Sequence, residues 1–313
     1  MSQHRVLADT PLAPAVLALL GDSVQIVPWS ALESASSMSV DAIYTYGHPT
    51  VDGPMLDRLT GVRVISNYGV GVDHIHLDAA AKRDIPVGNT PGILDGATAD
   101  MAFALLLAAA RRLVVGDHYA RSAAFTRYDP GYMLGHEVHH ATIGIIGPGR
   151  IGSQIAKRAA GFDMRIRYHS RTRKPELEQS YQAIASSLDE LLADSDFVVL
   201  SVPLTDDTRG IIGARELSLM KKSAILVNVA RGPVVDTAAL TDALERKTIY
   251  AAALDVTDPE PLPRDHRLLQ LDNVIIAPHL GSATVATRQK MAEMSVENLL
   301  AGLTGKPLPW RVV

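Results

Sequence analysis

The stretch that decides the fold is Ala141–Glu176, ATIGIIGPGRIGSQIAKRAAGFDMRIRYHSRTRKPE. Its apolar run TIGII predicts a buried strand, and RIGSQIAKRAA predicts a helix. Between them, Gly147, Gly149 and Gly152 form G-x-G-x-x-G. In this pattern the first glycine makes a tight turn, the second lets the backbone approach a pyrophosphate, and the third lets the helix pack close to the strand. We therefore expect a dinucleotide at the helix N-terminus, where free N–H groups favour an anion; a glycine-rich turn kept for packing is the alternative.

The next expected strand, MRIRY, ends in a basic run. A site that prefers NAD places Asp or Glu about twenty residues beyond the glycines, to bind the ribose hydroxyls. His169 stands at that position, and no acid occurs between residues 164 and 174. Ser170, Arg171 and Thr172 follow, and a guanidinium here can pair with the 2′-phosphate of NADP. The run favours NADPH as the cofactor, with NADH as a possible second one; a solvated loop is the alternative.

The composition is that of a globular chain. Its 313 residues suffice for two domains, 47% are apolar, and the interspersed charges sum to −4, so we expect neither a nucleic-acid nor a membrane partner. Cysteine is absent, which excludes disulfides and thiolate metal sites. The start, MSQHRVLADTPLAP, lacks the apolar core of a signal peptide, so a cytoplasmic location is expected. The longest apolar run, Met101–Ala110, predicts a buried helix.

Short β-rich runs alternate with helical patterns along the whole chain, which predicts parallel sheets built from βαβ units. The runs form two series: RVLA, VQIV, AIYTY and VRVIS, then TIGII, MRIRY, DFVVL, AILVNV, YAAALDV and NVIIA. We expect an α/β fold with two doubly wound domains, Rossmann-like or flavodoxin-like. The seam between them is expected near NTPGILDGATAD, and a lone terminal helix from about residue 285 to residue 300 could pack on either domain.

Three segments that follow expected strands carry reactive side chains: NVARGPVVD, LDVTDPEP and APHLGSAT. Ligands of open α/β sheets bind beyond the carboxyl ends of the strands, so Arg231, Glu260 and His279 are expected to converge near the nicotinamide. Each of these residues alone is more often a surface ion pair or a structural histidine. Together, in this order, they favour a catalytic site.

With these segments the chain resembles the D-isomer-specific 2-hydroxyacid dehydrogenases over nearly its full length. GPGRIG, N-x-A-R-G, D-V-x-x-x-E-P and P-H-x-G-S occur in that family's order and approximate spacing. The resemblance implies that Arg231 binds the substrate's carboxylate and carbonyl, that His279 is the acid/base, and that Glu260 hydrogen-bonds it. The chemistry agrees, because a 2-keto acid presents an anion for a bidentate arginine, and hydride delivery to its carbonyl carbon requires a proton on the oxygen.

The resemblance also implies a substrate-binding loop within SNYGVGVDHI. Its expected substrate-binding residues are Gly69, Val70 and Gly71. Backbone N–H groups at Val70 and Gly71 could form an anion nest there, although Gly69 and Gly71 could serve a tight turn alone. The motifs and the resemblance together imply a set of cofactor-binding residues, namely Thr98, Gly147, Gly149, Arg150, Ile151, Gly152, Ser170, Arg171, Thr172, Pro203, Ala230, Asp255, His279 and Gly281.

The family's arrangement implies a substrate-binding domain from residues 1–97 plus 284–313, a dinucleotide-binding domain from 98–283, and an active site in the interdomain cleft. It also implies a homodimer formed through about residues 101–132.

His136, Glu137 and His140 spell the zinc-protease pattern H-E-x-x-H, but little room for the required helix is expected before the strand, and no third ligand is evident. We expect no metal.

The sequence thus favours an NADPH-preferring reductase of small 2-keto acids that yields D-2-hydroxy acids, most like the glyoxylate/hydroxypyruvate reductases. Two alternatives remain open. One is a dinucleotide-sensing interaction protein of the co-repressor kind, and the other is an NAD-dependent dehydrogenase of another 2-hydroxy acid. The sequence does not rank the individual keto acids.

Overall fold

The computed structural model describes residues 3–9 and 11–313. The expected cytoplasmic location rests on the N-terminal segment. Three residues of that segment, Met1, Ser2 and Thr10, lie outside the described residues. The chain divides into two compact units: unit 1 comprises the described residues up to Leu94 and 284–313, and unit 2 comprises residues 95–283. The first boundary lies after Leu94 rather than after residue 97, because residues 95–97 form the first turn of a helix of unit 2.

Unit 1 contains a parallel sheet in the order β2-β1-β4-β6-β7 and a small sheet of β3 and β5. The four runs of the first series are confirmed as strands, although the last begins at Ile65 rather than Val62. The strands are β1 (His4–Ala8), β2 (Val24–Pro28), β3 (Met38–Ser39), β4 (Ala42–Thr45), β5 (Leu59–Thr60), β6 (Ile65–Asn67) and β7 (Val87–Gly88). The helices are α1 (Pro14–Leu20), η1 (Gly21–Ser23), α2 (Ser30–Glu33), α3 (Gly53–Asp57), α4 (Leu77–Ala81) and α12 (Val285–Leu303).

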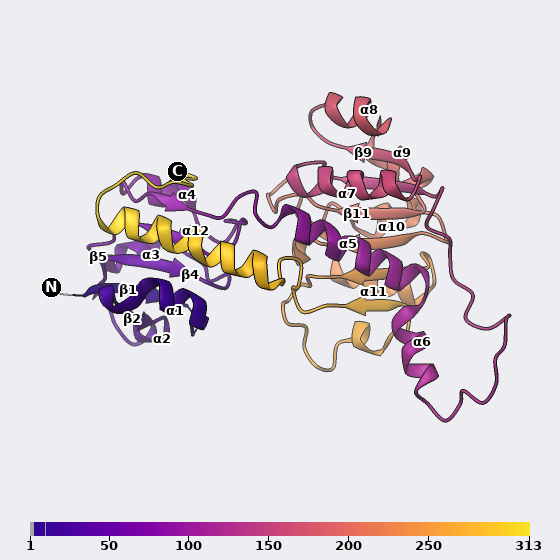
Figure 1. Ribbon diagram of the computed structural model, residues 1–313, viewed down its shortest axis with the longest axis horizontal. Coiled ribbons are helices and arrows are strands. Elements are labelled where there is room, and N and C mark those ends of the chain that lie inside the picture. Colours follow the sequence, from indigo (N-terminus) through magenta and orange to yellow (C-terminus); the bar gives the residue numbers. More distant parts are fainter. Residues whose placement is uncertain (1–2, 10) are drawn as a thin grey trace. The chain divides into compact units, whose positions relative to one another are not determined.

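The terminal helix α12 packs on unit 1, against α1 and the strands β4, β6 and β7 (Figure 1). Its Ser295 is fully buried, and the Ser295 hydroxyl lies 2.7 Å from the hydroxyl of Tyr44. The hydroxyl of Ser66 donates to the Ser295 carbonyl at 2.7 Å. At Gly302 an added Cβ would lie 2.4 Å from Cβ of Val64, so only glycine permits this closeness. The side chains of two strands therefore bind the helix that the sequence could not assign.

Unit 2 contains a parallel sheet in the order β10-β9-β8-β11-β12-β13-β14. All six runs of the second series are confirmed as strands, as is the doubly wound α/β class. The strands are β8 (Thr142–Ile146), β9 (Arg165–His169), β10 (Ile184–Ala185), β11 (Phe197–Leu200), β12 (Ile225–Asn228), β13 (Ala251–Leu254) and β14 (Val274–Ile276). The helices are α5 (Asp95–Ala110), α6 (Leu113–Ala120), α7 (Arg150–Gly161), α8 (Pro175–Tyr181), α9 (Leu188–Asp194), α10 (Ala214–Leu219), η2 (Gly232–Val234), α11 (Thr237–Glu245) and η3 (Arg267–Gln270).

Both faces of this sheet are covered, as the fully buried strand β8 requires. Helices α5 and α7 contribute to the apolar cluster on one face, and α9, α10 and α11 contribute to the cluster on the other. The chain winds from β8 to β9 and β10 in one direction and from β11 to β14 in the other. The carboxyl ends of β8 and β11 therefore flank the point where the winding reverses, which is where doubly wound sheets bind their ligands.

The apolar run Met101–Ala110 lies within α5, and most of its residues are buried, as expected. No helix in residues 3–9 and 11–313 is long and apolar enough to cross a membrane. After α6 the chain is irregular up to β8, and Figure 1 shows this segment running out from the body of unit 2 before it returns.

Candidate active site

The three glycines of the cradle have three different surroundings. Gly147 has a φ of +88°, and an added Cβ would lie 2.5 Å from Cγ1 of Val202. At Gly152, where α7 crosses the turn, an added Cβ would lie 2.4 Å from the carbonyl oxygen of Gly147. Gly149, the N-cap of α7, has no atom within 4 Å of that position. The outer glycines allow close packing and the middle one faces open space, so the cradle fits a pyrophosphate above the start of α7 at Arg150.

The basic run begins beside this cradle. The N–H of Gly147 donates to the carbonyl of His169 at 3.1 Å, which joins the ends of β8 and β9. Nδ1 of His169 lies 3.2 Å from the carbonyl oxygen of Ser186, so its ring is held toward the neighbouring β10 loop. The N–H of Thr172 points at the hydroxyl of Ser170 at 3.4 Å, and the side chain of Arg171 is exposed. The structure thus brings Ser170, Arg171 and Thr172 to the same edge as the glycines.

Arg231 is presented by a turn that a buried asparagine holds. Asn228, the last residue of β12, is 1% exposed; its Oδ1 accepts from the N–H of Ala230 at 3.0 Å, and its Nδ2 donates to the carbonyl of Arg231 at 2.9 Å. Gly232 follows, and an added Cβ there would lie 1.9 Å from the carbonyl oxygen of Thr257. Asn228 is not among the site residues predicted from the sequence. The signal was a carboxamide as the only polar side chain of an otherwise apolar strand, ILVN.

His279 and Glu260 meet as the sequence predicts. Nδ1 of His279 lies 2.8 Å from Oε1 of Glu260. A carboxylate only accepts, so Nδ1 carries the shared hydrogen and Nε2 is the nitrogen that can transfer a proton elsewhere. Both side chains are about one-third exposed, at 31% and 39%, so a small molecule can reach them. The φ of His279 is +56°, a region that residues other than glycine rarely occupy.

Asp255, at the end of β13, binds the loop that carries His279. Its Oδ1 accepts from the N–H of Leu280 at 2.7 Å, and its Oδ2 accepts from the N–H of Gly281 at 2.8 Å. Burial raises the pKa of this carboxyl, and the two N–H donors oppose that shift. An added Cβ at Gly281 would lie 2.9 Å from Oδ2 of Asp255 and 3.2 Å from Cγ2 of Thr98. Three of the expected cofactor residues, Thr98, Asp255 and Gly281, are therefore neighbours.

The remaining residues predicted in unit 2 lie at the same edge of the sheet. Pro203 follows β11, and its carbonyl accepts from the hydroxyl of Thr208 at 2.7 Å. Ala230 is buried after β12 and accepts from Nη1 of Arg231 at 2.9 Å. Ile151 lies in the first turn of α7. Because all the strands are parallel, the segments that follow β8, β11, β12, β13 and β14 emerge together.

The loop of residues 69–71 in unit 1 has its carbonyls turned into the protein. Nδ2 of Asn67 donates to the carbonyls of Gly69 and Gly71, both at 2.8 Å, and Nδ2 of Asn89 donates to the carbonyl of Val70 at 2.8 Å. Within the described residues, none of the three loop N–H groups donates a hydrogen bond. Neither glycine has a positive φ, so a left-handed turn does not explain them. The loop has the donors that an anion nest requires.

The H-E-x-x-H pattern does not form the helix that a zinc protease needs. Residues 136–140 are irregular, and the ring of His136 packs edge-on against Tyr250, with centroids 4.3 Å apart. Among residues 3–9 and 11–313, no group of three or more His, Asp or Glu side chains is arranged to hold a metal ion.

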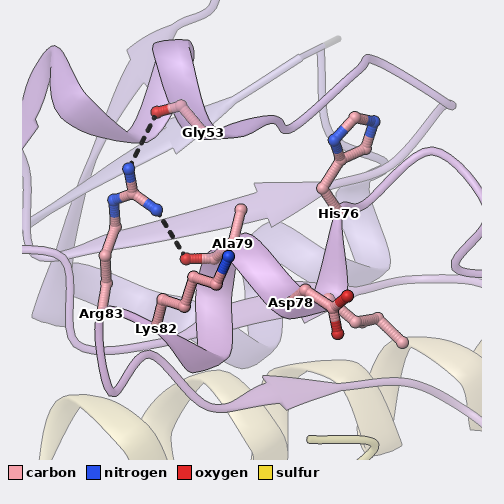
Figure 2. Close-up of a pocket in the computed structure, with 7 residues that line it drawn as sticks. Gly53, His76, Asp78, Ala79, Lys82 and Arg83 are labelled. Carbon is pink, nitrogen blue, oxygen red and sulfur yellow. Dashed lines mark hydrogen bonds between the residues drawn. The ribbon is translucent and has the colours of Figure 1, made fainter.

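A surface pocket of unit 1 lies between α3 and α4, and Figure 2 shows the side chains that line it. The Arg83 guanidinium donates to the carbonyls of Ala79 at 2.7 Å and Gly53 at 3.4 Å, and it forms an ion pair with Asp57 at 2.5 Å. Arg83 therefore links two helices. None of the predicted site residues lines this pocket.

The comparison with protein families agrees with this geometry. Residues 103–281 match the model described as D-isomer specific 2-hydroxyacid dehydrogenase, NAD binding domain. The chain belongs to the D-isomer-specific 2-hydroxyacid dehydrogenases. It is therefore an NAD(P)-dependent oxidoreductase, and the expected family is confirmed.

Among related sequences, the glyoxylate reductase of Thermococcus gammatolerans is 50% identical over 274 residues, which cover 86% of this chain and 82% of that protein. The glyoxylate reductase of Aeropyrum pernix is 44% identical over 99% of this chain and 96% of that protein. Among solved structures, an NADPH-dependent glyoxylate/hydroxypyruvate reductase from Sinorhizobium meliloti, in complex with NADP and malonate, has a TM-score of 0.89 at 32% identity and covers 100% of this chain and 97% of its own.

Proposed function

We propose that this dehydrogenase reduces small 2-keto acids of the glyoxylate and hydroxypyruvate type to D-2-hydroxy acids, with NADPH as its preferred cofactor. The observation that carries the proposal is the 2.8 Å bond between His279 and Glu260 at the sheet edge that also holds the glycine cradle. The names of the related glyoxylate reductases support the choice of substrate. When bound, the nicotinamide supplies the hydride.

Each protein group has one part in the reaction. The guanidinium of Arg231 binds the keto acid's carboxylate and polarises its carbonyl, and the N–H groups of residues 69–71 bind the same class of anion. His279, protonated on Nε2, donates that proton to the carbonyl oxygen as the carbon is reduced. Glu260 accepts the hydrogen on Nδ1, which orients the ring and leaves Nε2 as the nitrogen that transfers the proton.

The preference for NADPH rests on the end of β9. His169 stands where an acid would bind the ribose hydroxyls, and Ser170 and Arg171 follow it at the edge of the cradle. One charge-assisted contact with the 2′-phosphate contributes about 1.5–3 kcal/mol, which corresponds to a preference of about ten- to a hundredfold. The likeness to a reductase solved with NADP supports the same choice. A cell that keeps its NADP pool reduced would then use the protein in the direction of reduction. The proposed location is the cytoplasm.

The test is a panel of 2-keto acids, including glyoxylate and hydroxypyruvate, assayed in parallel with NADPH and NADH. We expect turnover with NADPH, abolished by His279→Ala while NADPH still binds, as measured by its fluorescence. Unchanged turnover in His279→Ala would reject the catalytic assignment. Binding of NADPH without turnover of any keto acid would instead favour a dinucleotide-sensing protein.

The cofactor preference has its own variant. Arg171→Ala should raise the KM for NADPH about ten- to a hundredfold and leave the KM for NADH within about twofold, because NADH has no 2′-phosphate. Equal efficiency of the wild-type protein with the two cofactors would show that the basic run does not select NADPH.

We also propose a homodimer formed through the region of α5, α6 and the irregular segment after it. This region exposes large apolar side chains at Leu113 (64%), Phe125, Tyr128 (81%), Tyr132 and Leu134. An apolar patch of this kind marks an interaction surface. Light scattering should give twice the mass of 33.6 kDa, and Tyr128→Asp with Leu134→Asp should give a monomer.

A further inference from the structure

A network of three side chains joins the basic segment 170–174 to helix α8. The buried hydroxyl of Tyr168, in β9, donates to Oε1 of Glu178 at 2.5 Å and accepts from the N–H of Lys174 at 2.8 Å. Arg173 binds the same carboxylate at two points, with Nε 3.0 Å from Oε1 and Nη2 2.7 Å from Oε2. Glu178 is therefore the residue that connects the strand, the segment and the helix.

The two arginines of the segment differ in their surroundings. The guanidinium of Arg173 already has a carboxylate partner in Glu178. Arg171 is exposed and has no hydrogen bond or ion pair to any residue in 3–9 or 11–313. A phosphate would have to compete with Glu178 for Arg173, whereas no side chain in the described part of the chain competes for Arg171.

We propose that Glu178 is a positioning residue for cofactor specificity: it holds Arg173 and the end of the segment on α8, and thereby presents Ser170 and Arg171 to the 2′-phosphate. The proposal rests on the preference for NADPH proposed above. It makes Arg173 part of the support and leaves Arg171 as the phosphate ligand.

The contacts of Glu178 have the geometry of the stronger kind of surface ion pair. Exposed pairs usually contribute little, but a bidentate arginine that belongs to a network is the exception. The side chain of Glu178 is 22% exposed, and its third partner, Tyr168, is 1% exposed. The bonds from Arg173 and Tyr168 hold the pKa of Glu178 below its usual value, so the carboxylate stays charged. A segment ordered in this way before binding loses less conformational freedom when the phosphate arrives.

The experiment is a double-mutant cycle on the KM for each cofactor. Glu178→Gln and Arg173→Ala should each raise the KM for NADPH about three- to tenfold, with the KM for NADH and kcat unchanged within about twofold. The KM of the double variant for NADPH should be no higher than that of either single variant, because both substitutions remove the same support. Tyr168→Phe, which removes only a hydroxyl, should act in the same direction. Glu176→Gln is the matched control, since Glu176 is exposed on the same helix and should leave both KM values unchanged.

Three outcomes would overturn the proposal. One is a Glu178→Gln variant with an unchanged or lower KM for NADPH, as expected if released Arg173 were itself a phosphate ligand. Another is an Arg173→Ala variant that raises the KM for NADPH as much as Arg171→Ala does, with an effect that adds to that of Glu178→Gln. The third is a wild-type protein that treats NADPH and NADH alike, which rejects the proposed cofactor preference as well. The first two reject the role of Glu178 alone.

Discussion

Oδ2 of Asp255 accepts the backbone N–H of Gly281 at 2.8 Å, and this is one of three hydrogen bonds that Asp255 makes to consecutive residues. Its Oδ1 accepts from Leu280, and its own carbonyl accepts from the N–H of His279 at 2.9 Å. A left-handed φ at a residue such as His279 costs about 1–3 kcal/mol. Asp255 therefore maintains an unfavourable backbone conformation at the proposed proton donor.

Replacing Asp255 by asparagine should misplace that donor. The amide keeps one oxygen, so one of the two N–H groups now faces an NH2 group. We expect kcat to fall at least about tenfold and the free energy of unfolding to fall by about 1–3 kcal/mol. Steady-state kinetics and urea unfolding measure the two effects. An unaltered kcat would show that these hydrogen bonds do not position His279.

Glu260→Gln should lower kcat. The amide oxygen can still accept a hydrogen bond from Nδ1 of His279, but a neutral acceptor holds the ring more weakly than a carboxylate does, and the amide can also turn its NH2 group toward the ring. The ring is then oriented less firmly, so we expect kcat to fall at least about tenfold, while the KM for NADPH stays within about twofold. Steady-state kinetics measures both quantities. An unchanged kcat would mean that Glu260 does not orient the proposed proton donor.

Substitutions at two of the cradle glycines should have different effects, one on cofactor binding and the other on stability. Gly149→Val adds atoms to the open space where we expect the pyrophosphate, so the KM for the cofactor should rise at least about tenfold, while unfolding is little changed. Gly152→Ala forces a Cβ against the Gly147 carbonyl, so it should destabilise the protein by about 1–3 kcal/mol. Comparing unfolding free energies with cofactor KM values tests the pair. If Gly149→Val were destabilised but kept its KM for the cofactor, the pyrophosphate would not bind at Gly149.

Much of the fold was predictable because its signals are local. The apolar runs of β8, β11, β12 and β13 are buried on both faces, and each is bounded by a turn or a helix. The two-residue strands β3, β5, β7 and β10 were missed, since so short a run has no period to recognise. The sequence does not assign α12 to either unit, because the hydroxyls that bind Ser295 lie more than two hundred positions away along the chain.

In the site, the reactive side chains were predictable and their supports were not. Arg231, Glu260 and His279 follow strands whose carboxyl ends must share an edge, and the structure does bring Glu260 and His279 into contact. Asn228 and Glu178 could not be predicted as supporting residues, because their functions depend on partners that only the folded chain brings near them. Residue type alone does not distinguish a supporting asparagine from an ordinary one.

Asn67 is another such support, and it connects the core of unit 1 to the expected anion nest. Its Oδ1 accepts from the hydroxyl of Thr45 at 2.8 Å, while its Nδ2 holds the carbonyls of Gly69 and Gly71 inward. Because these bonds occupy the carbonyls, the loop N–H groups would remain available for the carboxylate of the proposed keto acid.

Asn67→Ala should therefore weaken binding of the keto acid without weakening binding of the cofactor. Both loop carbonyls lose their donor and the loop is free to turn, so we expect the KM for glyoxylate to rise at least about tenfold. The KM for NADPH should stay within about twofold, because the glycine cradle belongs to unit 2 and makes no use of Asn67. Thr45→Val is the matched control: it removes a donor to the same asparagine at a similar cost of about 1–3 kcal/mol in stability, but it leaves both bonds to the loop in place. Equal increases in the KM for glyoxylate in the two variants would mean that general destabilisation, and not the orientation of the loop, governs substrate binding.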